Sequence, residues 1–154
     1  KPTNKAVVLY ATMWHSTEKM ARAISESLAE AGVKVGLVSM NDFHRSQAAY
    51  EVLDAGALIL GSSTLNNNML PQMADVTTYL RGLKPANLIG AAFGSFGWSG
   101  EGVRDLEAVL KEMKVEIAAP SVSVRNAPNE GALQICYDLG KTIAAELKKR
   151  LSAN

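Results

Sequence analysis

Apolar residues in this chain alternate between two spacings, and the alternation repeats five times along its 154 residues. Each time, a short continuous apolar run of strand length is followed by a segment whose apolar residues recur every three or four positions, as on one face of a helix. The expected strands are residues 6–11, 33–39, 57–60, 88–93 and 115–124, with a break in the last near Pro120. The expected helices are residues 16–31, 46–53, 71–83, 103–113 and 130–151. Because strands this apolar must be buried on both faces, the pattern predicts an α/β fold, a parallel sheet with helices packed on both faces.

Composition excludes several classes of function. Sixteen basic residues against fifteen acidic ones give a net charge of +1, so no broad positive field for nucleic acid is expected. No apolar run approaches the ~18 residues of a membrane-spanning helix, so we expect no membrane association. A single cysteine excludes an internal disulfide and favours a reducing compartment such as the cytoplasm. With only two histidines in the sequence, we also expect no histidine-rich metal site.

The length fits one domain. Residues 1–4 resemble the end of a linker, and residues 5–154 are expected to form the domain. Because the chain begins with Lys1 rather than methionine, we expect a processed chain or a piece of a longer one. Cys136 falls on the apolar face of the last helix and is expected to be a core residue rather than a redox thiol.

Three loops concentrate the polar and aromatic residues at one end of the predicted sheet. Ligands of open parallel sheets bind beyond the carboxyl ends of the strands, where the strand order reverses. The loops after the first, third and fourth strands are residues 12–17, 62–68 and 94–100, all rich in hydroxyl, amide, glycine or aromatic residues. The other loops, including the one after the second strand, contain nothing comparable, so we expect these three to form the site.

The first of these loops is suited to a phosphate group. It places the hydroxyls of Thr12, Ser16 and Thr17 around the start of a helix, where unpaired N–H groups and the positive end of the helix dipole attract anions. The alternative is that Ser16 merely caps the helix. Neither a Walker phosphate loop nor the Gly-x-Gly-x-x-Gly dinucleotide motif is present, which disfavours nucleoside triphosphate hydrolysis.

The other two loops are suited to a flat ring. Phe96 and Trp98 stand among glycines, where large aromatic side chains offer a stacking surface. The alternative is that Trp98 folds back on the core. Residues 66–68 are three asparagines, which carry donors and acceptors and tolerate left-handed backbone, although taken alone they are better explained by an ordinary turn. Together the three loops predict a phosphorylated flat heterocycle, and flavin mononucleotide (FMN) fits that description.

The same loops resemble those of flavodoxin-like domains. The resemblance extends from about residue 5 to residue 149 and rests on residues 9–18 (LYATMWHSTE), 61–66 (GSSTLN) and 94–101 (GSFGWSGE). The Thr-Met-Trp-x-Ser-Thr-Glu and Asn-Asn-x-Met-Leu-Pro stretches are more closely similar to flavodiiron proteins, also called A-type flavoproteins or rubredoxin:oxygen oxidoreductases. In those proteins a flavodoxin-like domain follows a β-lactamase-like di-iron domain. The resemblance implies a doubly wound five-stranded sheet of order 2-1-3-4-5.

The resemblance also implies a set of FMN-binding residues in this chain. The phosphate loop would contribute Thr12, Met13, Trp14, His15, Ser16 and Thr17, and the second loop Thr64, Leu65, Asn66 and Asn67 beside the isoalloxazine edge. The third loop would close the other side with Ser95, Phe96, Gly97, Trp98 and Gly100. His15 stands where many flavodoxins have glycine, so a positive φ at this position would strain it. Its side chain either reaches the phosphate or flavin edge or is simply exposed.

The function implied is a relay of single electrons. The FMN domain would receive them from a small iron–sulfur protein such as rubredoxin and pass them to a di-iron oxygen or nitric oxide reductase centre that this chain lacks. The resemblance leaves room for a homodimer of the full-length protein. The alternatives are a stand-alone flavodoxin, an FMN-dependent NAD(P)H:quinone or azo reductase, and a non-catalytic module that binds a phosphate ligand. A signalling receiver is disfavoured because the first and third strands end in Ala11-Thr12 and Gly61-Ser62 instead of acidic residues.

The charges around the three loops predict the redox behaviour. Glu18 and Glu101 are balanced by Lys19 and Arg104, and residues 62–68 contain no charge and no glycine. Many flavodoxins use carboxylates and a glycine near the flavin to separate its two one-electron potentials. We therefore expect the two potentials to lie closer together here than in acidic flavodoxins.

Overall fold

The computed structural model describes residues 3–65, 67–98 and 100–153. Within these residues, one sheet contains seven strands along the path β2-β1-β3-β5-β6, with β4 paired to β3 and β7 paired to β5. All pairings are parallel except that of β4 with β3. The strands are β1 (Lys5–Ala11), β2 (Lys34–Ser39), β3 (Ala57–Leu65), β4 (Asn68–Met69), β5 (Ile89–Phe96), β6 (Glu116–Ile117) and β7 (Val122–Arg125).

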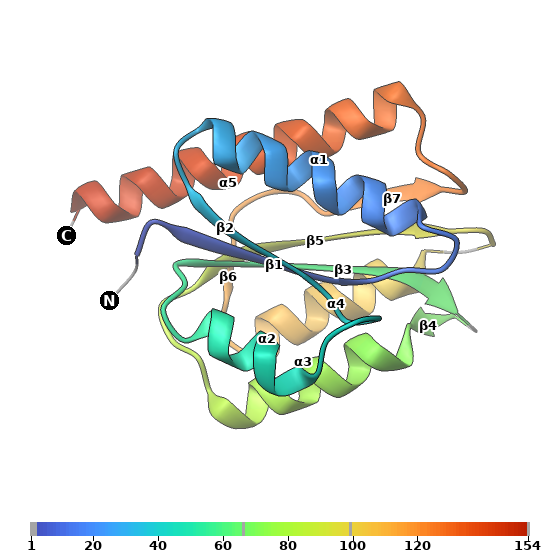
Figure 1. The fold of residues 1–154 in the computed structure, drawn as a ribbon, viewed down its shortest axis with the longest axis horizontal. Helices are drawn as coiled ribbons and strands as arrows, with labels where there is room; N and C mark the ends of the chain where they lie inside the picture. Colours follow the sequence, from blue (N-terminus) through green and yellow to red (C-terminus); the bar gives the residue numbers. More distant parts are fainter. Residues whose placement is uncertain (1–2, 66, 99, 154) are drawn as a thin grey trace.

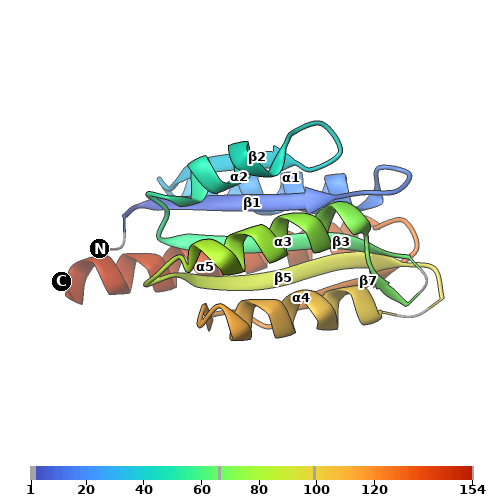
Figure 2. The same cartoon turned by 90° about the horizontal axis from the view of Figure 1, so that it is seen from below.

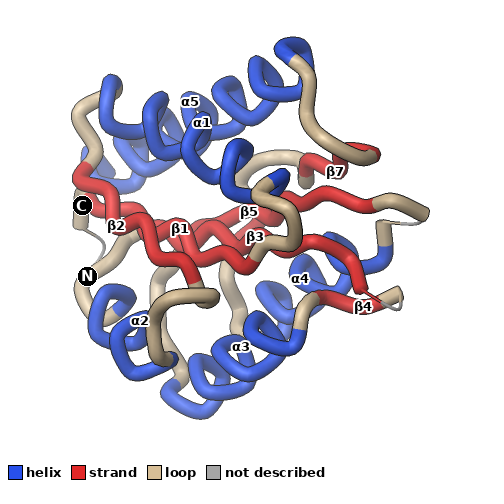
Figure 3. The backbone as a smooth tube through the Cα atoms, turned by 45° about the vertical axis from the view of Figure 1, so that its right-hand side comes forward, coloured by secondary structure: helices blue, strands red, loops and turns tan. Residues whose placement is uncertain are grey.

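Five helices are present in the described ranges, and they cover both faces of the sheet. They are α1 (Ser16–Glu30), α2 (Arg45–Val52), α3 (Pro71–Leu83), α4 (Glu101–Glu112) and α5 (Glu130–Ala153). Helices α1 and α5 lie on one face, and α2, α3 and α4 on the other, as Figures 1 and 3 show. Figure 2 shows α3 and α4 running along the strands on the second face. The predicted doubly wound architecture is therefore confirmed.

Strand β1 shows why the sheet has two cores. Its side chains alternate, with Val7 and Leu9 in the apolar cluster under α2, α3 and α4, and Val8 and Tyr10 in the cluster under α1 and α5. All seven residues of β1 are buried. A central parallel strand is covered on both faces, so its apolar residues form a continuous run without alternation. Periodicity alone cannot distinguish such a run from a buried helix segment.

The predicted strand order is confirmed when the short strands β6 and β7 are taken together as the fifth strand. The first four expected strands are β1, β2, β3 and β5, and they lie in the order β2-β1-β3-β5, which is the predicted 2-1-3-4. The fifth expected strand, residues 115–124, is split into β6 and β7, which both pair with β5. Pro120 lies in the gap between them, as the sequence predicted.

Two strands extend further than their apolar runs. Residues 61–65 and 94–96 were expected outside the strands, but they continue β3 and β5. The reason is pairing: Ser62 lies opposite Gly94 and Ser63 opposite Ser95, and the backbone ladder continues whether or not the side chains are apolar. The polar residues of the site therefore stand on rigid strand ends.

The chain start and the helices add two further observations. Asn4 donates a side-chain hydrogen bond to the Gly32 carbonyl at 3.0 Å, and Thr3 donates one to the Asp54 carbonyl, so these two residues contact the edge of the domain. In the described part of the chain, no helix has the length and apolar character needed to cross a membrane.

Candidate functional site: a cavity at the carboxyl ends of the strands

A cavity of about 390 Å³ opens at the edge of the sheet where β1, β3, β5 and β7 end. Its volume falls in the range of small-molecule sites. It is lined by Met13, Trp14, Ser16, Ser63, Thr64, Ser95, Phe96, Gly97, Trp98, Asn126 and Ala127. The loops after the first, third and fourth predicted strands therefore do converge, as the sequence predicted.

A cluster of four hydroxyl groups forms the base of this cavity at the start of α1. Ser16 Oγ lies 2.7 Å from Ser95 Oγ, and Thr17 Oγ1 lies 2.8 Å from Ser63 Oγ and 2.9 Å from Ser95 Oγ. Thr17, Ser63 and Ser95 are buried. Each hydroxyl can both donate and accept a hydrogen bond by rotating, and the 15-residue helix adds its positive end. Hydroxyl donors at a helix start fit a phosphate group.

The N-cap of α1 is His15, whose side chain makes no capping bond, and the hydroxyl that binds an N–H of the first turn is that of Thr12 rather than Ser16. The Thr17 N–H donates to Thr12 Oγ1 at 3.2 Å, whereas Ser16 Oγ donates to the Met13 carbonyl at 3.3 Å in addition to its contact with Ser95. The capping role that we considered for Ser16 is therefore wrong. Its hydroxyl is part of the cluster at the base of the cavity.

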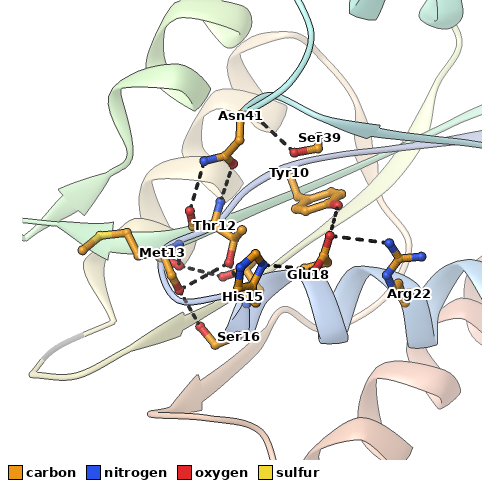
Figure 4. Close-up of polar contacts among 11 residues, drawn as sticks. Tyr10, Thr12, Met13, His15, Ser16, Glu18, Arg22, Ser39 and Asn41 are labelled. Carbon is orange, nitrogen blue, oxygen red and sulfur yellow. Dashed lines mark hydrogen bonds and ion pairs between the residues drawn. The ribbon is translucent and has the colours of Figure 1, made fainter.

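The loop before α1 turns through two residues in the left-handed conformation. Trp14 has φ 58° and His15 has φ 62°, so the position where many flavodoxins have glycine does require positive φ here. A residue other than glycine carries a conformational penalty in this region. The His15 side chain is 79% exposed, and its Nδ1 lies 3.3 Å from Glu18 Oε2 (Figure 4). Of the two alternatives for His15, the exposed side chain is the one observed.

The Glu18 carboxylate contacts several polar side chains beside this loop. Its carboxylate accepts a hydrogen bond from Tyr10 Oη at 3.2 Å and lies 3.5 Å from Arg22 Nη2 (Figure 4). Burial, followed by the nearby Glu18 carboxylate, raises the pKa of Tyr10. Tyr10 is therefore a neutral hydrogen-bond donor to Glu18 across the physiological pH range.

Two tryptophans stand almost entirely in solvent at the mouth of the cavity. Trp14 is 90% exposed and Trp98 is 88% exposed, while Phe96 at the end of β5 is half-buried. The alternative in which Trp98 folds back on the core is therefore wrong. Large aromatic side chains are rarely left this exposed unless they contact a ligand or a partner. A flat ring system lying against one or both of them would bury this surface.

In the second loop, the end of β3 pairs with β4 in antiparallel orientation, Thr64 with Met69 and Leu65 with Asn68. Thr64 lines the cavity, and its Oγ1 accepts a hydrogen bond from the Gly102 N–H at 3.1 Å, which ties β3 to the start of α4. Asn67 has φ 65°, in keeping with the turn alternative for the asparagines, and Asn66 lies outside the described residues. Leu65 is 37% exposed.

The predicted residues therefore take three different places. Eight line the cavity, namely Met13, Trp14, Ser16, Thr64, Ser95, Phe96, Gly97 and Trp98. Thr17 belongs to the hydroxyl cluster and Thr12 lies next to it, and neither lines the cavity itself. Four described residues stand outside its lining, namely His15, Leu65, Asn67 and Gly100.

Several site residues were missed by the sequence analysis. Ser63 belongs to the hydroxyl cluster, and Asn126 and Ala127 line the cavity from the loop after β7. The expectation that the remaining loops contribute nothing is therefore wrong. The Asn126 N–H donates to the Phe96 carbonyl at 2.6 Å, which holds this loop beside the end of β5. Asn126 has φ 61°, a conformation that asparagine tolerates, but the sequence around it gives no signal that points to the site.

The lining of the cavity is electrically neutral. It contains hydroxyl, amide, thioether and aromatic side chains and no charged residue from the described chain. Among the described residues, no group of three histidine, cysteine, aspartate or glutamate side chains could hold a metal ion. Any phosphate bound here would be held by hydrogen bonds and the helix dipole rather than by a basic side chain.

Comparisons with known proteins agree with this geometry. The family model described as flavodoxin matches residues 8–140. Rubredoxin-oxygen oxidoreductase of Megalodesulfovibrio gigas is 46% identical over 99% of this chain and 38% of its own length, and a nitric oxide reductase of Moorella thermoacetica is 44% identical over 93% and 36%. The chain thus spans little more than a third of the length of these curated relatives. A solved structure of a flavodoxin from the domain Archaea is 34% identical, with a TM-score of 0.85 over 94% of this chain and 99% of that one.

Proposed function

Because this chain belongs to the flavodoxin family, we propose that it binds FMN without covalent attachment in the cavity at the strand ends and transfers single electrons through it. FMN is the cofactor of this family, and when bound it supplies the ability to accept and release electrons one at a time. The observation that carries the proposal is the pairing of two exposed tryptophans with a neutral hydroxyl cluster in one cavity. One part fits a flat ring and the other a phosphate.

The residues have distinct roles in this proposal. Hydroxyls of Ser16, Thr17, Ser63 and Ser95, with the N–H groups at the start of α1, bind the phosphate. Trp14 and Trp98 cover the ring system and exclude water from it. The loop with Asn126 and the end of β3 with Thr64 bound the rest of the cavity. Four further predicted residues act through the shape of their loops, namely His15, Leu65, Asn67 and Gly100.

In a larger assembly, this domain would be one step in an electron relay. The names of two relatives, a rubredoxin-oxygen oxidoreductase and a nitric oxide reductase, support a rubredoxin-like donor and a reductase acceptor. We propose that the acceptor is a di-iron centre in a β-lactamase-like domain outside this chain, that residues 1–4 belong to the linker, and that the full-length protein acts in the cytoplasm as a homodimer. Oxygen and nitric oxide are both suitable terminal acceptors.

A stand-alone electron carrier is the second candidate. It is supported by the archaeal flavodoxin, whose chain is covered almost completely by this one. NADH oxidation by the purified chain separates both carriers from the NAD(P)H-dependent reductase alternative. A carrier oxidises NADH negligibly without an added reductase, whereas a self-contained reductase does so rapidly.

Titration of the apoprotein with FMN and with riboflavin tests the proposed site. The unchanged chain is expected to stay yellow after free FMN is removed by gel filtration, to quench the fluorescence of FMN and to bind riboflavin far more weakly. Ser16→Asp introduces a negative charge into the hydroxyl cluster, where it repels the phosphate. Because an acidic residue in the first turn of a helix is compatible with the dipole, the fold should tolerate the change.

Ser46→Asp is the matched control, since it makes the same change near the start of α2. Ser16→Asp should weaken FMN binding at least tenfold and leave riboflavin binding nearly unchanged, whereas Ser46→Asp should alter neither. Equal FMN affinity in the two variants would remove the phosphate from this position.

A further inference from the structure

Asn41, in the loop after β2, makes two side-chain hydrogen bonds to the backbone of Thr12. The Thr12 N–H donates to Asn41 Oδ1 at 2.9 Å, and Asn41 Nδ2 donates to the Thr12 carbonyl at 3.2 Å (Figure 4). Both backbone groups of Thr12 are therefore satisfied by a single carboxamide. This residue lies outside the cavity lining, in the loop where the sequence showed nothing of interest.

This contact extends the β1–β2 ladder past its end. The last residue pair of the two strands is Tyr10 with Ser39, and the Met40 N–H then donates to the Tyr10 carbonyl at 2.7 Å. Beyond Met40 the chain turns away, because the N–H groups of Asp42 and Phe43 both bond back to the Ser39 carbonyl at 3.1 Å. The Asn41 carboxamide takes the place that another strand residue would occupy beside Thr12.

Fixing Thr12 orients the rest of the phosphate loop, residues 12–17. Thr12 Oγ1 accepts a hydrogen bond from the Thr17 N–H at 3.2 Å. The N–H of Met13, the residue after Thr12, donates to Ser63 Oγ at 3.1 Å. The two left-handed residues, Trp14 and His15, follow at once. Their unfavourable conformation persists only if the surrounding contacts hold the loop. Asn41 supplies the contacts at the point where the loop leaves β1.

We propose that Asn41 is a positioning residue that holds the phosphate loop in its phosphate-binding conformation. It acts through Thr12 without touching the ligand, so its removal should weaken the phosphate part of the site selectively. The inference rests on the proposed function, because it takes the phosphate to be that of FMN. Without the carboxamide, water solvates the Thr12 backbone, and binding must then order the loop.

The test compares Asn41→Ala with Asn4→Ala. Asn4 is a matched control, because it is also exposed and its carboxamide also bonds a backbone carbonyl, that of Gly32 at 3.0 Å, at the opposite end of the same two strands. Affinities for FMN and riboflavin are measured for the whole chain of each variant. Amide hydrogen exchange of Thr12 and Met13 is measured in the apoproteins, which gives a readout that needs no flavin.

Asn41→Ala should weaken FMN binding roughly tenfold, equivalent to about 1.4 kcal/mol, with riboflavin binding changed less than about twofold. Its Thr12 and Met13 amides should exchange faster, while Asn4→Ala should match the unchanged chain in all three measurements. An equal loss of FMN and riboflavin affinity, an equal effect of Asn4→Ala, or unchanged exchange at Thr12 would overturn the inference. If the unchanged chain bound no FMN, the proposed function itself would fail. FMN binding that Asn41→Ala leaves unaltered would overturn only the role of Asn41.

Discussion

The two exposed tryptophans allow ligand contact to be measured without disturbing the fold. Trp98 is 88% exposed, so Trp98→Ala removes little buried surface from the apoprotein. If the ring of FMN lies against Trp98, the variant should lose roughly 1 kcal/mol or more of binding free energy through lost stacking and burial. Titration with FMN measures this loss, and the thermal midpoint of the apoprotein should remain within a degree or two. Unchanged affinity would show that Trp98 does not contact the ring.

Cys136 illustrates a residue whose chemistry is suppressed by its surroundings. It is completely buried in the apolar cluster under α1 and α5, and burial raises the pKa of its thiol to about 11. Since the thiolate is the reactive form, a pKa this high leaves about a thousandth of the thiol ionised at pH 8. The native protein should therefore react with a thiol reagent very slowly at pH 8, and the denatured protein rapidly. Fast stoichiometric labelling of the native chain at pH 8 would contradict the assignment of Cys136 to the core.

The residue scale also shows what the sequence could reveal about the site. Trp98 and Ser16 could be identified because an aromatic residue among glycines and a hydroxyl before an amphipathic helix are local signals. Ser63 and Asn126 carry no such signal. They join the site because the parallel register aligns Ser63 with Ser95 and because Asn126 bonds the end of β5. These relations connect residues distant in sequence, so local reasoning could not find them.

At the scale of whole elements, the helices were predicted well and the strand ends poorly. α3 begins at Pro71 and ends at Leu83 as expected, because proline favours the first turn and the apolar period continues to that point. β3 continues to Leu65 although its apolar run ends at Leu60. Helix limits are set by local capping and periodicity, whereas strand limits depend on the partner strand. The loops that we assigned to the site are therefore partly strand.

The contact between α1 and α5 gives a prediction at the same scale. A Cβ atom at Gly140 in α5 would overlap the Ser27 hydroxyl and crowd the Ile24 carbonyl of α1. Gly140→Ala should therefore destabilise the fold by about 1–3 kcal/mol, despite the better helix propensity of alanine. Gly82→Ala in α3 is the control, since no atom lies within 4 Å of its added Cβ, and it should stabilise by up to about 1 kcal/mol. Urea unfolding of both variants measures the difference, and a neutral Gly140→Ala would mean that the two helices separate easily.

On the scale of the whole molecule, the doubly wound sheet determines where chemistry can occur. Parallel register brings the carboxyl ends of β1, β3, β5 and β7 to one edge, and the residues that line the cavity come from these ends and the loops that follow them, together with Ser16 at the start of α1. The sequence pattern predicted this edge because it predicted the sheet. The electrostatic character of the site follows from the same placement, since the residues that line the cavity are neutral, while Arg125 at the end of β7 and the charged side chains of the surrounding helices lie outside this lining.

The neutral lining of the cavity leads to a prediction about the two one-electron potentials of bound FMN. A carboxylate near the reduced ring makes its negative charge unfavourable by on the order of 1–4 kcal/mol and so lowers the second potential. Here the two acidic residues of the loop regions are paired, Glu18 with Arg22 at 3.5 Å and Glu101 with Arg104 at 3.3 Å. The turn after β3 also lacks the glycine that acidic flavodoxins use to stabilise the half-reduced flavin. Both features should bring the two potentials closer together than in acidic flavodoxins.

A potentiometric titration of the FMN-loaded chain measures both potentials, and Arg104→Glu shows whether charge controls them. Arg104 is 76% exposed, and its replacement leaves Glu101 without this partner and adds a second negative charge at the start of α4. The second potential should fall and the separation between the two should widen. Lys148→Glu makes the same change of charge near the end of α5, at the opposite end of the molecule from the cavity, and screening should leave both potentials unchanged there (Figure 1). A nearly complete, long-lived half-reduced flavin in the unchanged chain, with a very low second potential, would show that charge and turn geometry do not set the potentials of this domain.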